Sequence, residues 1–178
     1  LPAAQTGSGT VKLNTSIVML PKEPMQPRFA DDRVGFFQNS LTEFSDDQQT
    51  TDRGAIIQRY RLEPKDPERY RRGQLSEPKN PIIYYIDPAT PKKWIPYLKA
   101  GVEDWNTAFE AAGFKNAIIA KEWPNDPNMS LDDARYSVIR YLPSETENAY
   151  GPRIVDPRSG EIMESHICWY HNVMNLLK

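Results

Sequence analysis

The amino-acid sequence predicts an α+β fold in which a β-sheet is backed by one long helix and preceded by a β-rich segment. Short runs rich in β-branched and aromatic residues recur along the chain, and one long stretch, residues 91–112, carries apolar residues at helical spacing. Residues 156–160 have the composition of a hairpin turn. At 178 residues the chain suits one main core with a lead-in and is too short for two full cores.

The N-terminal part is expected to be extended. Residues 1–10 are polar and predict a flexible linker. Residues 10–20 (TVKLNTSIVML) are β-branched and apolar, which predicts a strand. The prolines at 21, 24 and 27 would end this strand, and a chain lying across a surface should follow.

The next segment predicts an antiparallel pair of strands. Residues 33–44 and 55–62 are rich in apolar and aromatic side chains, and they flank the polar loop 45–53. Residues 63–81 hold four prolines and many charges, so they predict an internal boundary or a long surface loop. The sequence therefore divides into a linker (1–10), a β-rich lead-in segment (11–79) and the beginning of a larger domain (80–178).

A buried strand and a helix follow this boundary. Residues 82–86 (IIYYI) form an apolar run typical of a buried strand. Thr90 and Pro91 have the pattern of an N-cap and a first helical position, although Pro96 offers a later start. Gly113 predicts the C-terminal stop. The expected apolar face of this helix comprises Leu98, Val102, Trp105, Phe109 and Ala112.

The remaining elements complete the sheet. Residues 116–121 and 134–142 predict two further strands. The turn at 156–160 (DPRSG) predicts a hairpin with a bulge, whose arms are 153–155 and 161–168. The second arm runs on to Trp169 and is free to lie at the edge of the sheet. Residues 169–178 have the pattern of a helix that has begun, which suggests a segment of a larger protein.

Composition excludes several classes of protein. The 22 basic and 24 acidic residues give a net charge of -2, without the basic excess of a nucleic-acid binder. No apolar window is long enough for a membrane span. Cys168 is the only cysteine, so there is no intrachain disulfide and no paired-cysteine metal motif. Nucleotide-binding glycine loops and a serine-hydrolase elbow are also missing.

Three clusters offer chemistry, each with a simpler structural interpretation that we favour. His166 and His171, with Glu161, Glu164 and Cys168, could form a zinc site or a thiol with its base, but their spacing fits structural roles better. The acidic pairs could serve glycoside hydrolysis, but solvated loops are the simpler interpretation. Trp94, Trp105, Trp123, Tyr84 and Tyr85 could form a sugar platform, but core packing is favoured. The acidic pairs are Asp31–Asp32, Asp46–Asp47, Asp132–Asp133 and Glu161 with Glu164.

Two longer motifs carry a family resemblance. They are E-D-W-N-x-A-F-E-A-A-G-F over 103–114 and Y-G-P-R-I-V-D-P-R-S-G-E-I over 150–162. With their surroundings from residue 80 on, they resemble a family of large bacterial zinc-dependent metallopeptidases of metzincin type. The run SIVMLPKEPMQPRFADDRVGFF upstream resembles the segment that leads into the catalytic domain of that family.

The resemblance implies an upper subdomain: a twisted mixed sheet with a backing helix, whose edge strand pairs with an extended peptide substrate through its backbone. The residues to which it assigns this substrate-binding edge are Glu161, Ile162, Met163, Glu164, Ser165, His166, Ile167 and Cys168. The family's zinc motif, H-E-x-x-H followed by a third histidine, does not occur in these residues. No catalytic residue or metal ligand can therefore be assigned here, and zinc is expected only in the full-length parent protein.

These observations lead to three functional hypotheses. The first is a fragment of a secreted, periplasmic or envelope zinc metallopeptidase that is inactive alone, with a peptide or protein substrate and the downstream part of the catalytic domain as partners. The second is a non-enzymatic module that binds peptide or glycan. An exposed edge strand could also mediate dimerisation. Glycoside hydrolysis is the third and least favoured hypothesis.

Overall fold

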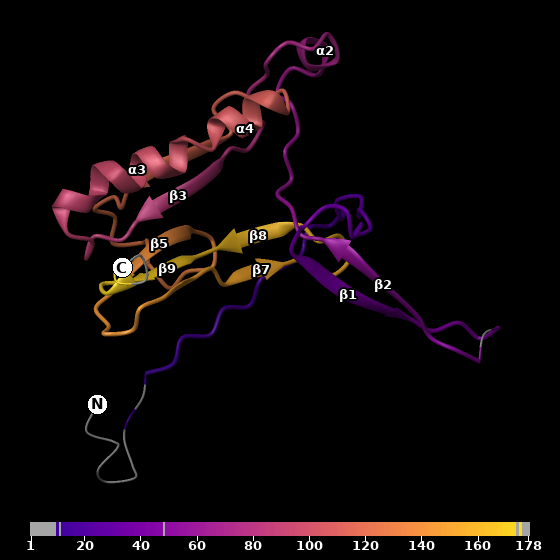
Figure 1. Cartoon of the computed structure of the whole chain (residues 1–178), viewed down its shortest axis with the longest axis horizontal. Helices are drawn as coiled ribbons and strands as arrows, with labels where there is room; N and C mark the ends of the chain where they lie inside the picture. Colours follow the sequence, from indigo (N-terminus) through magenta and orange to yellow (C-terminus); the bar gives the residue numbers. More distant parts are fainter. Residues whose placement is uncertain (1–9, 11, 48, 174, 176–178) are drawn as a thin grey trace.

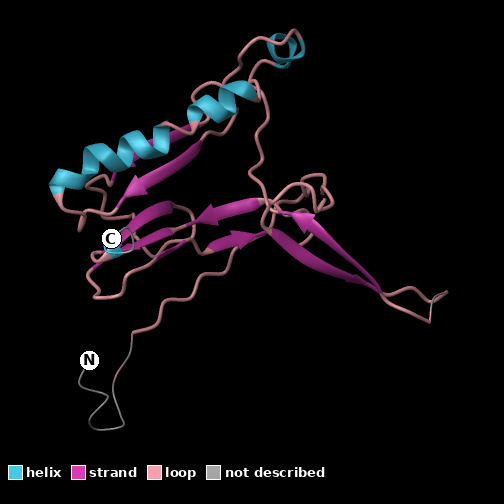
Figure 2. Ribbon diagram, viewed as in Figure 1, coloured by secondary structure: helices cyan, strands magenta, loops and turns pink. Residues whose placement is uncertain are grey.

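The structure is a computed structural model that describes residues 10, 12–47, 49–173 and 175. It is a mixed α+β fold with three sheets in this part of the chain, and the largest is a twisted mixed sheet (Figures 1 and 2). The strands are β1 (Gln38–Glu43), β2 (Asp52–Ile57), β3 (Ile82–Ile86), β4 (Ile118–Glu122), β5 (Ser137–Leu142), β6 (Ala149–Tyr150), β7 (Arg153–Val155), β8 (Ile162–Ser165) and β9 (Ile167–Tyr170). The helices are α2 (Pro67–Arg71), α3 (Ile95–Glu103) and α4 (Asn106–Ala111), with a 3-10 turn η1 (Lys92–Trp94).

The predicted strand over residues 10–20 is wrong for the described part of that range, where the chain forms no strand. Ile17 and Met19 are 98% and 91% exposed. The side chains have strand propensity, but propensity acts only where a neighbouring strand accepts the backbone hydrogen bonds. The predicted linker 1–10 lies outside the described residues except for Thr10.

The chain over 21–26 is held by arginine side chains. Arg158, Arg61 and Arg59 donate hydrogen bonds to the backbone carbonyls of Pro21, Glu23 and Gln26, at 2.8, 3.0 and 2.7 Å. A proline-rich segment cannot use its own amides to join a sheet, so its carbonyls are bound by side chains instead. This matches the expectation of a chain lying across a surface.

The antiparallel pair predicted in the lead-in segment is confirmed as β1 and β2, with shifted ends, since β2 begins inside the predicted loop 45–53 and stops at Ile57. The register is unbroken from Gln38↔Ile57 to Glu43↔Asp52. Their ribbon extends away from the rest of the molecule in Figure 1. Residues 63–81 form the predicted surface connection, and they contain the short helix α2, which begins at the Asp66 N-cap.

The five-stranded sheet has the order β4-β3-β5-β9-β6. The first four strands are parallel to one another, and only β6 is antiparallel to its neighbour β9. The predicted strand 82–86 is confirmed as β3, while β4 and β5 confirm the strands predicted over 116–121 and 134–142 with shifted ends. Parallel neighbours need long crossover connections, and α3 with α4 forms the crossover between β3 and β4.

The backing helix begins later than Thr90 and is interrupted. The 3-10 turn η1 comes first, and α3 starts at Ile95 with Pro96 in its first turn. The Thr90 hydroxyl is buried and makes no hydrogen bond, so the prediction of Thr90 as N-cap is wrong. Pro96 cannot donate a backbone hydrogen bond, which is tolerated in the first turn of a helix and not in its interior. Gly113 has a φ of 91° and ends the helical region as predicted.

The helices cover one face of the sheet (Figure 2), and the core lies between them. Val102 is buried there, and Leu98 and Phe109 pack against the same cluster. Trp105 is 64% exposed, so the predicted helical face is only partly buried. The sheet residues of this core are Ile82, Tyr84, Ile86, Ile118, Ala120 and Ile139.

The hairpin around residues 156–160 is confirmed, but its second arm is not one continuous edge strand as the sequence predicted: β8 ends a two-stranded sheet with β7, whereas β9 is internal. The arm divides into β8 and β9 on either side of His166, and β9 lies between β5 and β6 inside the sheet. Trp169 and Tyr170 belong to β9, which corrects the prediction that a helix begins at 169; residues 174 and 176–178 lie outside the described residues. The edge on this side of the sheet is β6, in the first arm of the hairpin.

Gly160 has no room for a side chain. Its φ is 72°, and an added Cβ would lie 2.1 Å from the carbonyl oxygen of Ile57. We expect Gly160→Ala to lower the free energy of unfolding by roughly 2–5 kcal/mol, from left-handed strain and overpacking together. Chemical denaturation monitored by circular dichroism measures this loss.

Gly73→Ala is the matched control. Gly73 has the same φ of 72°, but its added Cβ would meet no atom within 4 Å. The control variant should lose only about 1–2 kcal/mol of stability, because its alanine is strained in the left-handed conformation. Equal losses in the two variants would contradict the close approach of Gly160 to β2.

Candidate functional site

The residues that the resemblance assigned to substrate binding do not share one exposed edge. Glu161 forms a bridge with Arg59, and residues 162–165 form β8. His166 separates the strands, and Ile167 and Cys168 lie in β9. The two arms of the hairpin nevertheless keep one register, since Ser165 faces Arg153 and Cys168 faces Tyr150.

The second side of β8 faces the protein body. The amide of Ile162 donates to the carbonyl of Arg59 at 2.9 Å, and the amide of Ser165 donates to the Ser137 hydroxyl at 3.1 Å. An extended ligand therefore cannot add to β8 without displacing these bonds.

The outer side of the first arm, residues 149–153, is the open edge. The carbonyls of Asn148 and Pro152 accept hydrogen bonds from Tyr170 and His166, so the even-numbered residues face the second arm. Backbone groups alternate along a strand, which leaves those of Ala149 directed outward. Its amide donates only to the neighbouring Asn148 side chain, at 2.8 Å.

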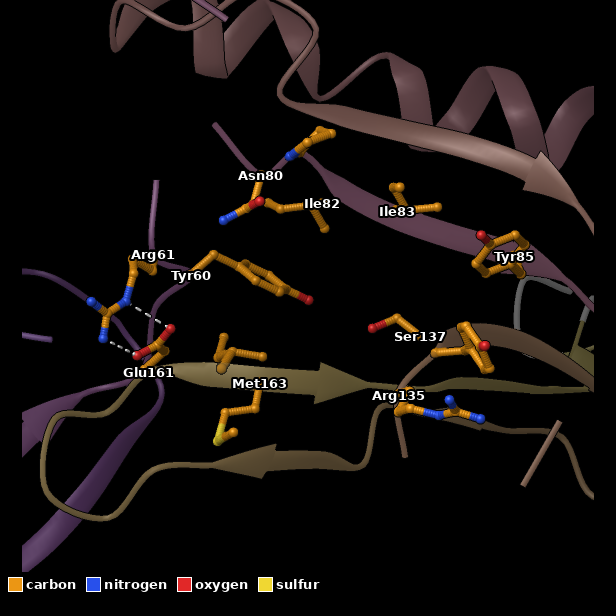
Figure 3. A pocket seen from close by; sticks show the side chains of 13 residues that line it. Tyr60, Arg61, Asn80, Ile82, Ile83, Tyr85, Arg135, Ser137, Glu161 and Met163 are labelled. Carbon is orange, nitrogen blue, oxygen red and sulfur yellow. Dashed lines mark hydrogen bonds and ion pairs between the residues drawn. The ribbon is translucent and has the colours of Figure 1, made fainter. Parts of the chain in front are cut away.

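A cleft of about 340 Å³ lies between the start of β3 and the start of β8 (Figure 3). It forms because pairing of β3 with β5 begins only at Tyr84↔Ser137. Glu161 and Arg61 make a two-point ion pair at one end, at 2.7 and 2.9 Å. The Tyr60 ring points into the space between the two strands in Figure 3, and Met163 of β8 is among the lining residues. The charged side chains that line the cleft, Arg61, Glu161 and Arg135, are all in ion pairs.

A larger apolar groove of about 660 Å³ lies along α3 on the helical face of the sheet. Its lining includes Leu98 from α3, Trp105 from the turn between α3 and α4, and Ile139 and Trp169 from the sheet. Tyr97 and Trp105 at its rim are 72% and 64% exposed. Exposed apolar surfaces of this kind are typical of sites that bind protein, ligand or membrane.

The histidines and Cys168 take structural roles in the described residues. His166 Nδ1 bonds to the buried carboxylate of Glu164, and His171 Nδ1 bonds to the Tyr141 hydroxyl. Cys168 is buried as a free thiol. Within the part of the chain that the structure describes, no group of three His, Cys, Asp or Glu side chains could hold a metal ion.

The acidic pairs and the aromatic residues that the sequence offered as candidates do not come together into one site. Asp31 and Asp133 bind their neighbours Arg33 and Arg135, and these guanidinium groups hold the pKa of each carboxyl below its usual value. Tyr85 packs edge-to-face on Trp123, whereas Trp94 packs on Trp169. The aromatic side chains thus form separate packed clusters rather than one flat platform.

Sequence reasoning missed the edge at β6 and the ion pair between Arg61 and Glu161. A two-residue strand is too short for a periodicity signal. The ion pair joins residues that are far apart in sequence, so it could only be found from the fold.

Comparison with known proteins yields one family match. A family model described as a domain of unknown function (DUF5117) matches residues 2–65. No curated protein matches the chain, and no solved structure matches it. Among the described residues, no helix is long and apolar enough to cross a membrane.

His166 should make stability depend on pH. Its hydrogen bond with Glu164 raises the pKa of His166 above the ordinary 6.5, while burial and Arg140 act in the opposite direction. A histidine whose pKa is raised in the folded state stabilises the fold fully at pH values below its unfolded-state pKa. This stabilisation is lost as the pH rises through its folded-state pKa. We therefore expect the melting temperature to fall as pH increases from about 6.5 through the raised pKa of His166.

The His166→Gln variant should lack this fall because its amide does not titrate. His171→Gln is the control and should retain the fall, since His171 contacts Tyr141 and not Glu164. Thermal unfolding at several pH values measures both variants. A pH profile in His166→Gln identical to that of the unchanged protein would contradict the assignment.

Proposed function

We propose that this chain supplies the upper part and the substrate edge of the catalytic domain of a zinc-dependent metallopeptidase of metzincin type. In this proposal the parent protein acts outside the cytoplasm or in the cell envelope, and the chain does not cleave peptides alone. The observation that carries the proposal is the mixed sheet with helices on one face and a short antiparallel edge strand whose outward backbone groups are open.

The two motifs of the family resemblance fall on the parts that shape this sheet. Asn106, in the first motif, accepts hydrogen bonds from the amides of Ala117 and Ile118 and donates to the carbonyl of Ile118. It therefore fixes the helical crossover to the start of β4. The second motif covers the open arm 149–155 from Tyr150 onward and the buried turn that follows.

Substrate would bind by adding a strand. The open backbone of Ala149 can exchange hydrogen bonds with an extended peptide whatever the side chains of that peptide are. β8 pairs with β7 on one side, and Ile162 and Ser165 already bond to Arg59 and the Ser137 hydroxyl on the other. Residues 167–168 lie in an internal strand, so we assign this role to the arm containing β6 rather than to residues 161–168.

The zinc ion would be bound outside the described residues, since these do not offer a set of ligands that fits it. The apolar groove along α3 supports a further part of the catalytic domain packing there, because it leaves Tyr97 and Trp105 largely uncovered. No step of peptide hydrolysis is derived from the side chains of this chain.

Reading the gene beyond the codon for Lys178 tests the proposal directly. We expect an H-E-x-x-H motif followed by a third histidine shortly downstream. The isolated chain should neither bind zinc in stoichiometric amount nor cleave peptides. A frame without that motif would favour the alternative, a peptide-binding module that uses the same open edge.

Ala149→Pro in the full-length protein tests the substrate edge. Proline removes the outward amide of Ala149, and a lost hydrogen bond should lower kcat/KM for extended peptides by roughly tenfold. Ala149→Ser keeps the amide and should retain activity. Thermal unfolding confirms that both variants fold. Unchanged peptide turnover in a folded Ala149→Pro variant would remove β6 from the substrate site.

A further inference from the structure

The outer edge of β1 is open, whereas β2 is covered on both sides. On one side of β2, the amide of Ala30 donates to the carbonyl of Ala55, and the amide of Ile57 donates to the carbonyl of Arg28. On the other side lies β1. Residues 28–30, β2 and β1 thus form a small sheet that ends at β1.

The hydrogen bonds identify which groups of β1 face outward. The amide of Gln58 donates to the carbonyl of Phe37, and the register places Asn39 opposite Ile56 and Leu41 opposite Gly54. The odd-numbered residues of β1 therefore bond to β2, because the bonding direction alternates along a strand. The backbone groups of Gln38, Ser40 and Thr42 face away from β2, and all three residues are exposed.

This edge lacks the usual protection against strand pairing. Natural edge strands are blocked by lysine, proline or a bulge. The sequence of β1, QNSLTE, has neither lysine nor proline, and its register with β2 has no bulge. Phe36 and Phe44, which flank the strand, are 51% and 81% exposed. The edge thus combines free backbone groups with exposed aromatic side chains.

We propose that β1 pairs antiparallel with β1 of a second copy of this chain, about a two-fold axis through Ser40. Only this register joins all three outward residues, with Ser40 opposite Ser40 and Gln38 opposite Thr42 of the second copy. The same register places Phe36 opposite Phe44 of the second copy, twice by symmetry. The two small sheets then form one continuous sheet with aromatic cross-strand pairs at both ends of the new contact.

Charge is compatible with this self-pairing. Glu43 is the only charged residue of β1, and it lies opposite Phe37 of the second copy. No like charges face each other within the paired strands. A second copy is therefore the partner that this edge fits. Its backbone groups, its aromatic side chains and its charges are all compatible with those of the first copy.

Sedimentation of the full 178-residue chain over a range of concentrations tests the association. We expect the mass to rise from one chain to two. Phe44→Lys removes both aromatic pairs and should weaken dimerisation by about tenfold or more. Phe29→Lys is the matched control: Phe29 is also exposed, at 72%, but it lies beyond β2 and should leave dimerisation unchanged.

Cysteine cross-linking tests the register. The two Ser40 Cα atoms would lie about 5.5 Å apart, within disulfide range, so Ser40→Cys should cross-link on oxidation. Two copies of Gln38 would lie roughly 13 Å apart along the strands, so Gln38→Cys should not. The unchanged chain, whose single cysteine Cys168 is buried, gives the background level of cross-linking. A monomer at every concentration, a Phe44→Lys dimer of full strength, or faster cross-linking through Gln38→Cys would each overturn the proposal.

Discussion

The contact between Arg59 and the turn at 156–160 joins the lead-in segment to the rest of the fold. The amide of Arg59 donates to the carbonyl of Gly160, and its carbonyl accepts from the amide of Ile162, both at 2.9 Å. This two-bond bridge is possible only because Gly160 leaves space for the backbone of Ile57. Asp156 and Ser159 are fully buried beneath this contact. The position of β8, and through it the register of β9 and β6, depends on this junction.

Charged side chains strengthen the junction because they bind backbone and buried partners rather than one another on an open surface. Arg158 contacts both the buried carboxylate of Asp156 and the carbonyl of Pro21, so one side chain joins the turn to the N-terminal segment. Arg61 joins Glu161 to the carbonyl of Glu23 in the same way. Charge-assisted bonds of this kind are stronger than neutral ones, whereas exposed ion pairs contribute little. The proline-rich segment is thereby positioned without forming a strand of its own.

Local sequence signals predicted the elements whose ends are set by local chemistry. The strand β3 was found with its exact bounds because an apolar run lies between Pro81 and the pair Asp87–Pro88. The turn at 156–160 was found because proline and glycine occupy the positions that a tight hairpin requires. The wrong predictions concern segments whose structure depends on a pairing partner elsewhere in the chain. Residues 12–20 have strand-like composition but no neighbouring strand, and no local pattern reports whether such a neighbour exists.

The assignment of a substrate edge illustrates the same limit at the candidate site. The sequence identified a long hairpin arm over residues 161–168, and the register of β8 and β9 against β7 and β6 agrees with one long hairpin. Which arm faces outward in the large sheet depends on β5, which pairs with β9 and so makes the β9 part of the second arm internal. Strand addition needs only an open backbone, so the side chains of residues 149–153 carry no signature of such a role. The open arm therefore had to be found from hydrogen-bond directions, and its assignment depends on the pairing of β5 with β9 more than on any functional side chain.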